Sequence, residues 1–265
     1  MPPSEFYTHG HSTAVTGSHA RRTVADSAAF FVNRLESDSV LLDFGCGPGS
    51  ITVDLADRIG PDGTVVGIDN NRDVLAIACN DSAAPNLSYV QGSVYCLPFS
   101  DNTFDLAYGH QVLQHLADPV AALSEVRRVL RPGGTVALRD ADYGSMTHHP
   151  HYPELDEWKD LYSRVARRNG GEPDAGRRLQ EWVDAAGYAD ICSRASAWHY
   201  STHEQRETWA SLWAERIQVP RFADRAKALD DDIDIARLAT AWLNWAHEPD
   251  GWFAFLHGEV TAVKP

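Results

Sequence analysis

Between Val40 and Asp140, short apolar runs alternate with amphipathic helical patterns, and this alternation constrains the fold more than any other feature of the chain. Parallel strands need crossover connections, usually helices, which cover the faces of the sheet and leave the strands buried on both sides. We expect five strands in this region and two more after it, which gives a seven-stranded α/β sheet. The expected strands are VLLDF, TVVGID, LSYVQGSV, FDLAYGH, TVALRD, the stretch 191–200 and FAFLHGEVTAV.

The helices expected between these strands have clear end signals. After the first strand, Ile51, Leu55 and Ile59 share one helical face, and a Gly-Pro pair follows them. Asp118 followed by Pro119 is a typical helix start before the apolar stripe of VAALSEVRRVL. Further helices are expected around 74–79 and in AGRRLQEWVDAAGY.

The glycine loop GCGPGS follows the first expected strand and lets the backbone approach a ligand closely. It has no lysine, which a P-loop needs, and Ser50 stands where a dinucleotide fingerprint needs its last glycine. Pro48 removes one N–H that a pyrophosphate would use, and Asp43 adds a negative charge at the strand end. The loop therefore favours a cationic ligand. Asp69 closes the second strand, where a carboxylate can accept hydrogen bonds from both ribose hydroxyls.

Four stretches carry a family resemblance: LLDFGCGPGS, VVGIDNN, VQGSVYCLPFSDNTFDLAYGHQVLQHLADP and VLRPGGTVALRD. In order and spacing they resemble the class I S-adenosylmethionine-dependent methyltransferases, in the branch that includes ubiquinone and menaquinone biosynthesis C-methyltransferases and many secondary-metabolite enzymes. The likeness spans about residues 40–140. It implies a Rossmann-like seven-stranded sheet whose last strand is antiparallel, with S-adenosylmethionine as the cofactor.

The resemblance also implies cofactor contacts at three places. They are Asp43, Gly45, Cys46 and Gly47 around the methionine part, Asp69 and Asn70 at the ribose, and Gly92, Ser93 and Val94 near the adenine. The family commonly has Asp where this chain has Ser93. We expect His110 and Gln111, after the fourth strand, to contact the cofactor as well.

Methyl transfer needs a base only if the nucleophile must lose a proton, so proximity and exclusion of water can supply most of the catalysis. The candidate catalytic residues are His110, His115 and Asp142. For His110 a cofactor contact is favoured over a role as base. His115 is equally well read as a hydrogen-bonded helix histidine.

Two segments fall outside the alternation: the N-terminal stretch 6–35 and the stretch 202–249, both helical in pattern. We expect both to cover the carboxyl ends of the strands, where open α/β sheets bind ligands. The expected organisation is an N-terminal helical cover (1–35), an S-adenosylmethionine-binding Rossmann-like core (36–201), a Trp-rich helical lid insertion (202–250) and the final strand of the core (251–265).

By analogy with related enzymes, four residues of the N-terminal cover could reach the cofactor: Tyr7, His11, His19 and Arg22. A guanidinium suits the cofactor carboxylate. The alternative is a solvated polar arm. No metal site is expected from the HGH pair, because no carboxylate partner accompanies it.

The lid segment and its border contain Trp209, Trp213, Trp242, Trp245 and Trp252. Such large side chains could pack on an aromatic acceptor, yet spacings of three and four residues suit ordinary helix packing equally well.

A formal charge of −14 disfavours a nucleic-acid partner, because such proteins usually present a basic face. The four cysteines lack metal or disulfide spacing, and no stretch is apolar and long enough to span a bilayer. We therefore expect a cytoplasmic methyltransferase that acts on a small, hydrophobic or aromatic acceptor at O, N, S or C. The alternatives are a quinone-biosynthesis C-methyltransferase, a cofactor-binding protein without transfer activity and, disfavoured by the charge, an RNA methyltransferase. The sequence leaves the oligomeric state open.

Overall fold

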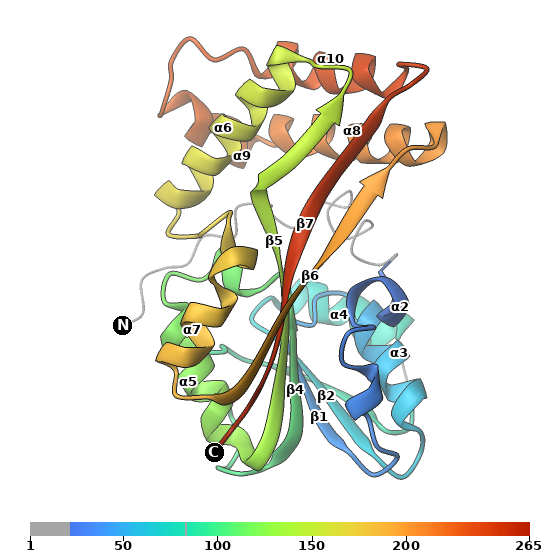
Figure 1. Ribbon diagram of the computed structural model, residues 1–265, viewed down its shortest axis with the longest axis vertical. Helices are drawn as coiled ribbons and strands as arrows, with labels where there is room; N and C mark the ends of the chain where they lie inside the picture. The colour runs from blue at the N-terminus through green and yellow to red at the C-terminus, as the bar shows by residue number, and fades with distance from the viewer. Residues whose placement is uncertain (1–21, 83) are drawn as a thin grey trace.

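The computed structural model describes residues 22–82 and 84–265. Seven strands form one sheet in the order β3-β2-β1-β4-β5-β7-β6 (Figure 1). Strand β7 is antiparallel to both of its neighbours, whereas the other pairs are parallel. The strands are β1 (Val40–Phe44), β2 (Thr64–Asp69), β3 (Leu87–Gln91), β4 (Phe104–His110), β5 (Leu130–His149), β6 (Ala189–Tyr200) and β7 (Trp252–Val263). This confirms the predicted Rossmann-like sheet with an antiparallel last strand.

Helices cover both faces of this sheet and one end of it (Figure 1). The α-helices are α2 (Val24–Ser27), α3 (Ser50–Ile59), α4 (Arg72–Asp81), α5 (Pro119–Val129), α6 (Pro153–Arg168), α7 (Leu179–Ala185), α8 (His203–Gln218), α9 (Pro220–Lys227) and α10 (Ile235–Ala246). Short 3₁₀ turns are η1 (Val32–Arg34), η2 (Leu113–His115) and η3 (Ala175–Arg178).

The predicted helix ends are confirmed where the sequence signals were strongest. Helix α3 ends at Gly60, whose φ of 83° suits glycine, and it buries Ile51, Leu55 and Ile59. The side chain of Asp118 accepts a hydrogen bond from the backbone N–H of Ala121, so it caps α5 at its amino end.

Two hydrophobic clusters pack helices on the two faces of the sheet around β1, β2 and β4. One packs α2 and α3 against the sheet, with Leu55 and Leu41 among its fully buried members. The other packs α5 and α7 against it, and it includes Val126, Val183 and Leu138. A sheet covered on both faces exposes ligand-binding groups only at its strand ends, so the site must lie there.

Strands β5, β7 and β6 continue far beyond the others, and helices α6, α8, α9 and α10 pack on this extension (Figure 1). The β5–β7 pairing runs from Thr135 opposite Val263 to His149 opposite Trp252, with a register shift after Asp142. A third cluster of buried residues fills the space between this extension and the helices, and its largest fully buried members are Trp158, Trp213, Trp242 and Trp245.

The sequence analysis ended the fifth strand at Asp140, but β5 continues to His149. The acids and the glycine in DADYGS weaken the strand pattern, whereas pairing with the equally long arm of β7 keeps the segment extended. Helix α6 was not among the expected elements, although Leu155, Trp158, Tyr162 and Val165 form its buried stripe.

The helical pattern expected for the stretch 6–35 falls partly outside the described residues. In the described part, 22–35, only α2 and η1 are helical. Ala28, directly after α2, and Phe31, directly before η1, belong to the hydrophobic cluster that packs on the sheet. The stretch expected to be a lid, by contrast, contains the three helices α8, α9 and α10.

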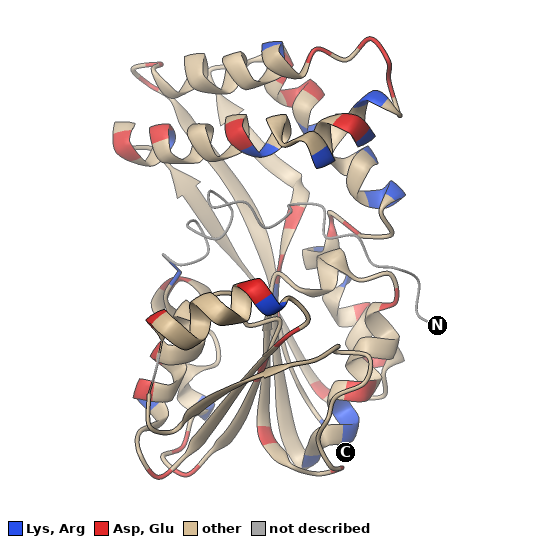
Figure 2. Cartoon of the chain, turned by 180° about the vertical axis from the view of Figure 1, so that it is seen from behind, with Lys and Arg blue, Asp and Glu red and all other residues tan. Residues whose placement is uncertain are grey.

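Lys, Arg, Asp and Glu residues lie mainly on the helices and connecting loops, and the strands contain few of them (Figure 2). Among the charged residues of the strands, Asp43 and Asp69 lie at the carboxyl ends of β1 and β2, where a ligand is expected to bind. Within the described ranges, no helix is both long and apolar enough to cross a membrane.

Candidate active site

A cavity of about 490 Å³ lies at the carboxyl ends of β1, β2 and β4. Strand order reverses between β1 and β4, and open α/β sheets bind ligands at such a reversal. The volume is in the range of cofactor sites. Most of the predicted cofactor residues line this first cavity: Arg22, Asp43, Gly45, Cys46, Gly47, Asp69, Asn70, Gly92, Ser93, Val94, His110 and Gln111.

The three glycines of the loop have positive φ angles, but they are needed for different reasons. A Cβ on Gly45 would lie 2.4 Å from the Val112 side chain, and one on Gly49 would lie 2.3 Å from the Tyr89 hydroxyl. A Cβ on Gly47 would meet nothing within 4 Å. Gly47 lines the cavity, so its missing side chain leaves room for a ligand at the backbone.

The carboxylate of Asp69 is held in place by two backbone donors. Gly47 N–H donates to Oδ2 at 3.0 Å and Asn71 N–H donates to Oδ1 at 2.9 Å. Each carboxylate oxygen has a further lone pair, so the group can still accept hydrogen bonds from a diol such as a ribose. This arrangement fits the predicted ribose contact.

Asp43 lines the first cavity and is 3% exposed. Burial raises its pKa to about 7, and the hydrogen bond donated by the Thr52 hydroxyl at 2.6 Å opposes part of that shift. A cation bound nearby would favour the charged carboxylate and lower this pKa. The buried carboxylate therefore suits a cationic ligand better than a neutral one.

His110 and His115 both line the first cavity, and neither lines the second cavity described below. His110 is 7% exposed and its ring stacks against that of Tyr108, with centroids 6.4 Å apart. The ring Nε2 of His115 is 3.0 Å from the side-chain nitrogen of Gln114. Their position fits a cofactor contact, as the sequence analysis favoured for His110.

A second cavity, of about 1180 Å³, is lined mainly by residues of β5, β6 and helix α8. Aromatic side chains form much of its wall: Tyr143, Trp198, Tyr200, Trp209, Trp213 and Phe255. Wide apolar walls with a few polar groups are typical of small-molecule sites. Arg139 and Arg216 supply positive charge to the same cavity.

Arg22 and Gln111 line both cavities. The Arg22 guanidinium donates to Oε1 of Gln111 at 2.6 Å, and Nε2 of Gln111 is 2.9 Å from Nε2 of His257. His257 is completely buried, and this burial lowers its pKa well below the usual value, so the imidazole is neutral. Gln111 has a φ of 54°, in the left-handed region that residues other than glycine adopt only rarely.

Other residues from the sequence analysis lie elsewhere. Asp142 accepts two hydrogen bonds from Arg177, at 2.5 and 2.6 Å, and it lines neither cavity. The structure therefore gives Asp142 an ion pair in place of the catalytic position that we expected. Tyr7, His11 and His19 lie outside the described residues.

Some of the five tryptophans serve only in helix packing, and others also line a cavity where an aromatic acceptor could bind. Trp242 and Trp245 are fully buried among the upper helices, and Trp252 is 40% exposed and lines neither cavity. Trp209 and Trp213 belong to the same buried cluster but also form part of the wall of the second cavity.

Several lining residues were not anticipated. Arg221 on α9 lines the first cavity, and Arg139, Trp198 and Arg216 line the second. Trp198 and Tyr200 are two residues apart in the expected strand 191–200, and residues at this spacing share one face of a strand. This spacing could have indicated that they lie together.

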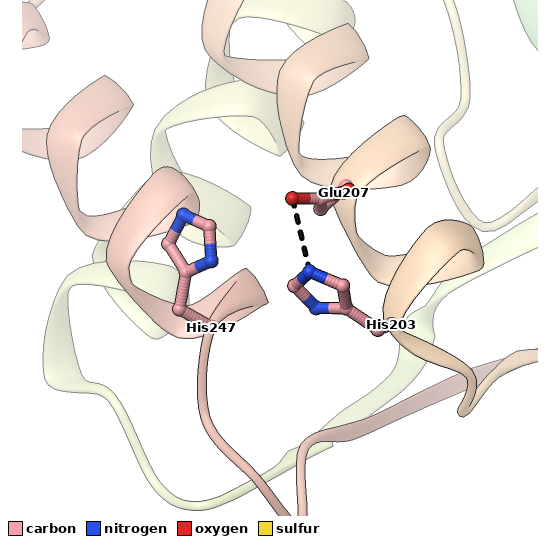
Figure 3. Close-up of side chains that lie close together, drawn as sticks. All are labelled: His203, Glu207 and His247. Carbon is pink, nitrogen blue, oxygen red and sulfur yellow. Dashed lines mark ion pairs between the residues drawn. The ribbon is translucent and has the colours of Figure 1, made fainter.

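The sequence analysis expected no metal site. Within the described part of the chain, one group could hold an ion: His203, Glu207 and His247, whose ligand atoms all lie within 4.8 Å of one another (Figure 3). Two histidines and a carboxylate suit Zn²⁺. All three side chains are exposed, and Nε2 of His203 lies 3.1 Å from a carboxylate oxygen of Glu207. A surface pair of His203 and Glu207 with His247 beside it therefore explains the cluster equally well without a metal ion.

Comparison with known proteins agrees with this geometry. Residues 42–138 match the family model described as a methyltransferase domain. An uncharacterized methyltransferase of Schizosaccharomyces pombe is 34% identical over 275 residues, which cover 98% of this chain and 96% of the relative. The demethylmenaquinone methyltransferase of Lactococcus lactis is 34% identical over 125 residues, which cover 46% of this chain and 47% of that enzyme. The crystal structure of the YcgJ protein of Bacillus subtilis superposes with a TM-score of 0.58 at 18% identity, and the match covers 91% of this chain and 98% of that one.

The relative from S. pombe extends over nearly the whole chain, and the family model covers the strands that build the first cavity. The sheet order, the glycine loop and the acids after β1 and β2 supply the matching geometry. The protein belongs to the class I S-adenosylmethionine-dependent methyltransferases, and S-adenosylmethionine is its cofactor.

Proposed function

We propose that this protein transfers a methyl group from S-adenosylmethionine, bound in the first cavity, to a small aromatic metabolite bound in the second. The observation that carries the proposal is the sharing of Arg22 and Gln111 by the two cavities. Two adjoining cavities let a donor and an acceptor meet at a common boundary, which is what an in-line displacement requires.

The aromatic wall of the second cavity supports an acceptor with a flat apolar body. Tyr200 and Trp209 stack with ring centroids 4.4 Å apart, and Trp198 lies 4.4 Å from the ring of His257. Stacking on such rings adds to the free energy gained by burying apolar area. The second cavity therefore suits an aromatic acceptor, whereas the first suits the cofactor.

S-adenosylmethionine supplies an electrophilic methyl group on a positively charged sulfur, so its leaving group needs no acid. In this proposal Asp43 and Asp69 hold the cofactor, and Gln111 and Arg22 limit where the acceptor can approach. His110 and His115 line the cofactor side, so we assign them contact with the cofactor. Neutral His257, hydrogen-bonded to Gln111, keeps the Gln111 amide oriented at the boundary.

C-methylation of a quinol is the second candidate. The partial match to the demethylmenaquinone methyltransferase favours it, but the match covers less than half of this chain. A flat quinol ring would also suit the aromatic wall of the second cavity.

The test is turnover by the purified protein with S-adenosylmethionine and a panel of phenols, aromatic hydroxy acids and naphthoquinols. The readouts are formation of S-adenosylhomocysteine and the mass of the product. We expect turnover with an aromatic acceptor, and none with the Gly47→Val variant. Turnover restricted to naphthoquinols would favour the quinone alternative. Tight binding of S-adenosylhomocysteine with no turnover across the panel would favour a cofactor-binding role without transfer.

A further inference from the structure

Three arginines are buried in the described part of the chain: Arg139, Arg206 and Arg216, which are 1%, 5% and 5% exposed. A guanidinium stays charged in a protein, so each buried one needs compensation from an anion or from hydrogen-bond acceptors. Differences in that compensation separate structural arginines from one that awaits a ligand.

Arg206 and Arg139 are compensated within the fold. Arg206, near the start of α8, donates hydrogen bonds to backbone carbonyls, which include those of Ala246, Glu248 and Gly251. Arg139 pairs with Glu259, with Nε to Oε1 at 3.2 Å, so its charge is balanced, although its Nη1 is buried without an acceptor among the described residues.

Arg216 has no such partner in the part of the chain that the structure describes. No hydrogen bond or ion pair reaches its side chain from residues 22–82 or 84–265, and its Nε is buried without an acceptor. Its guanidinium lies 4.6 Å from the ring centroid of Trp213, a contact that offsets only part of the lost hydration. Arg216 nevertheless lines the second cavity, so an anion in that cavity can reach it.

We propose that Arg216 is the counter-ion for an acidic group on the acceptor, so that the second cavity selects a planar aromatic acid. This inference rests on the proposed function, because it takes the second cavity as the acceptor site. A carboxylate matches the fork of donors on a guanidinium, while the ring of the acid would pack on the aromatic wall.

The cavity also has acidic lining residues, namely Asp26, Glu207 and Glu215. All three are exposed, where water and salt screen their charges. The two buried charges that line the cavity, Arg139 and Arg216, are both positive, and Glu259 already neutralises the first. The buried part of the cavity therefore favours an anion.

The experiment compares 2-naphthoate with 2-naphthamide, which share a shape but differ in charge. Each is titrated by calorimetry into the full chain saturated with S-adenosylhomocysteine. We expect the wild type to bind 2-naphthoate about tenfold more tightly than the amide, the scale of one hydrogen bond to a charged group. The Arg216→Gln variant should bind both probes about equally. Arg216→Lys, which keeps the charge without the fork, should retain part of the preference.

Arg237→Gln is the matched control, because Arg237 is exposed on α10, pairs with Glu154 and lines neither cavity. It should keep the full preference for 2-naphthoate. Equal binding of the two probes by the wild type, or binding of neither, overturns the inference even if Arg216→Gln fails to fold. A preference that survives in folded Arg216→Gln also overturns it.

The outcomes separate this inference from the proposed function. A protein that binds S-adenosylhomocysteine and methylates a neutral aromatic acceptor, yet shows no preference for 2-naphthoate, refutes the role of Arg216 alone. A protein that prefers 2-naphthoate through Arg216 but methylates no acceptor of the panel refutes the proposed transfer alone.

Discussion

The guanidinium of Arg22 donates a 2.6 Å hydrogen bond to Oε1 of Gln111, and these two residues line both cavities. The bond joins the segment before α2 to the loop after β4, across 89 positions of the chain. A ligand in the first cavity that also contacts Arg22 would fix this boundary. Cofactor binding and the shape of the second cavity are therefore expected to be coupled.

Arg22→Ala should weaken binding of S-adenosylhomocysteine by about 1.5 to 3 kcal/mol, because it removes a charged donor that can pair with the ligand carboxylate. Calorimetry measures the affinity, and thermal unfolding should change little, because Arg22 is only partly buried. The affinity for 5′-methylthioadenosine, which has no carboxylate, should stay the same. Equal losses for both ligands would contradict a carboxylate contact. Arg34→Ala, an exposed change outside both cavities, is the control.

Gly47→Val should abolish binding of S-adenosylhomocysteine while the fold survives. A side chain at this position points into open space beside the cavity lining, where the ligand approaches the backbone. The variant also places a β-branched residue at a φ of 56°, which costs about 1 to 2 kcal/mol of stability.

Gly60→Val separates the two effects. Gly60 also has a positive φ, 83°, with nothing within 4 Å of its Cβ position, and it lies outside both cavities. We expect it to lower the melting temperature and leave cofactor affinity unchanged. Cofactor binding by Gly47→Val at wild-type strength would mean that the loop serves only as a turn.

Asp69→Ala should weaken S-adenosylhomocysteine binding by about 1 to 3 kcal/mol, the cost of losing hydrogen bonds to a charged group. Because Asp69 also holds the N–H groups of Gly47 and Asn71, the loop should lose stability as well. Competition with adenosine and 2′,3′-dideoxyadenosine isolates the ribose contact. The wild type should prefer adenosine and the variant should not. A preference that persists in the variant would remove Asp69 from the ribose site.

The sheet and the first cavity could be predicted because their signals are local. Asp43, the glycine loop and Asp69 each lie at the end of a strand that the apolar pattern reveals, and parallel strands bring such ends together. The family resemblance added Gly92, Ser93 and Val94, which line the same cavity and which no spacing rule would supply.

The second cavity could not be predicted, because its parts meet only in three dimensions. Arg139 lies on β5, Trp198 on β6 and Arg216 on α8. Their relative positions depend on the part of β5 beyond Asp140, which was not expected, and on the pairing of β5 and β6 with β7. That Arg216 has no hydrogen-bond partner within 22–82 and 84–265 is a property of the packed structure that the sequence does not reveal. In the same way, no signal near Asp142 in the sequence predicts its ion pair with Arg177.

The buried carboxyl of Asp43 makes the stability of the protein depend on pH. Burial raises its pKa from 3.8 to about 7, so the native protein binds more protons than the unfolded chain between these values. Its contribution to the free energy of unfolding therefore falls as pH rises through that window. Asp140, whose pKa burial raises to about 8, acts in the same direction on stability.

Cofactor binding isolates Asp43, because Asp140 lines neither cavity. A cationic ligand prefers the ionised carboxylate, so the affinity for S-adenosylmethionine should rise as pH increases from about 5.5 to about 7, with protons released on binding. Calorimetry in buffers of different ionisation enthalpy measures both effects. Neutral 5′-methylthioadenosine should show no such rise, and Asp43→Asn should remove it for S-adenosylmethionine. A rise that persists in folded Asp43→Asn would place the titrating group elsewhere, and a flat profile in the wild type would remove the ammonium from the vicinity of Asp43.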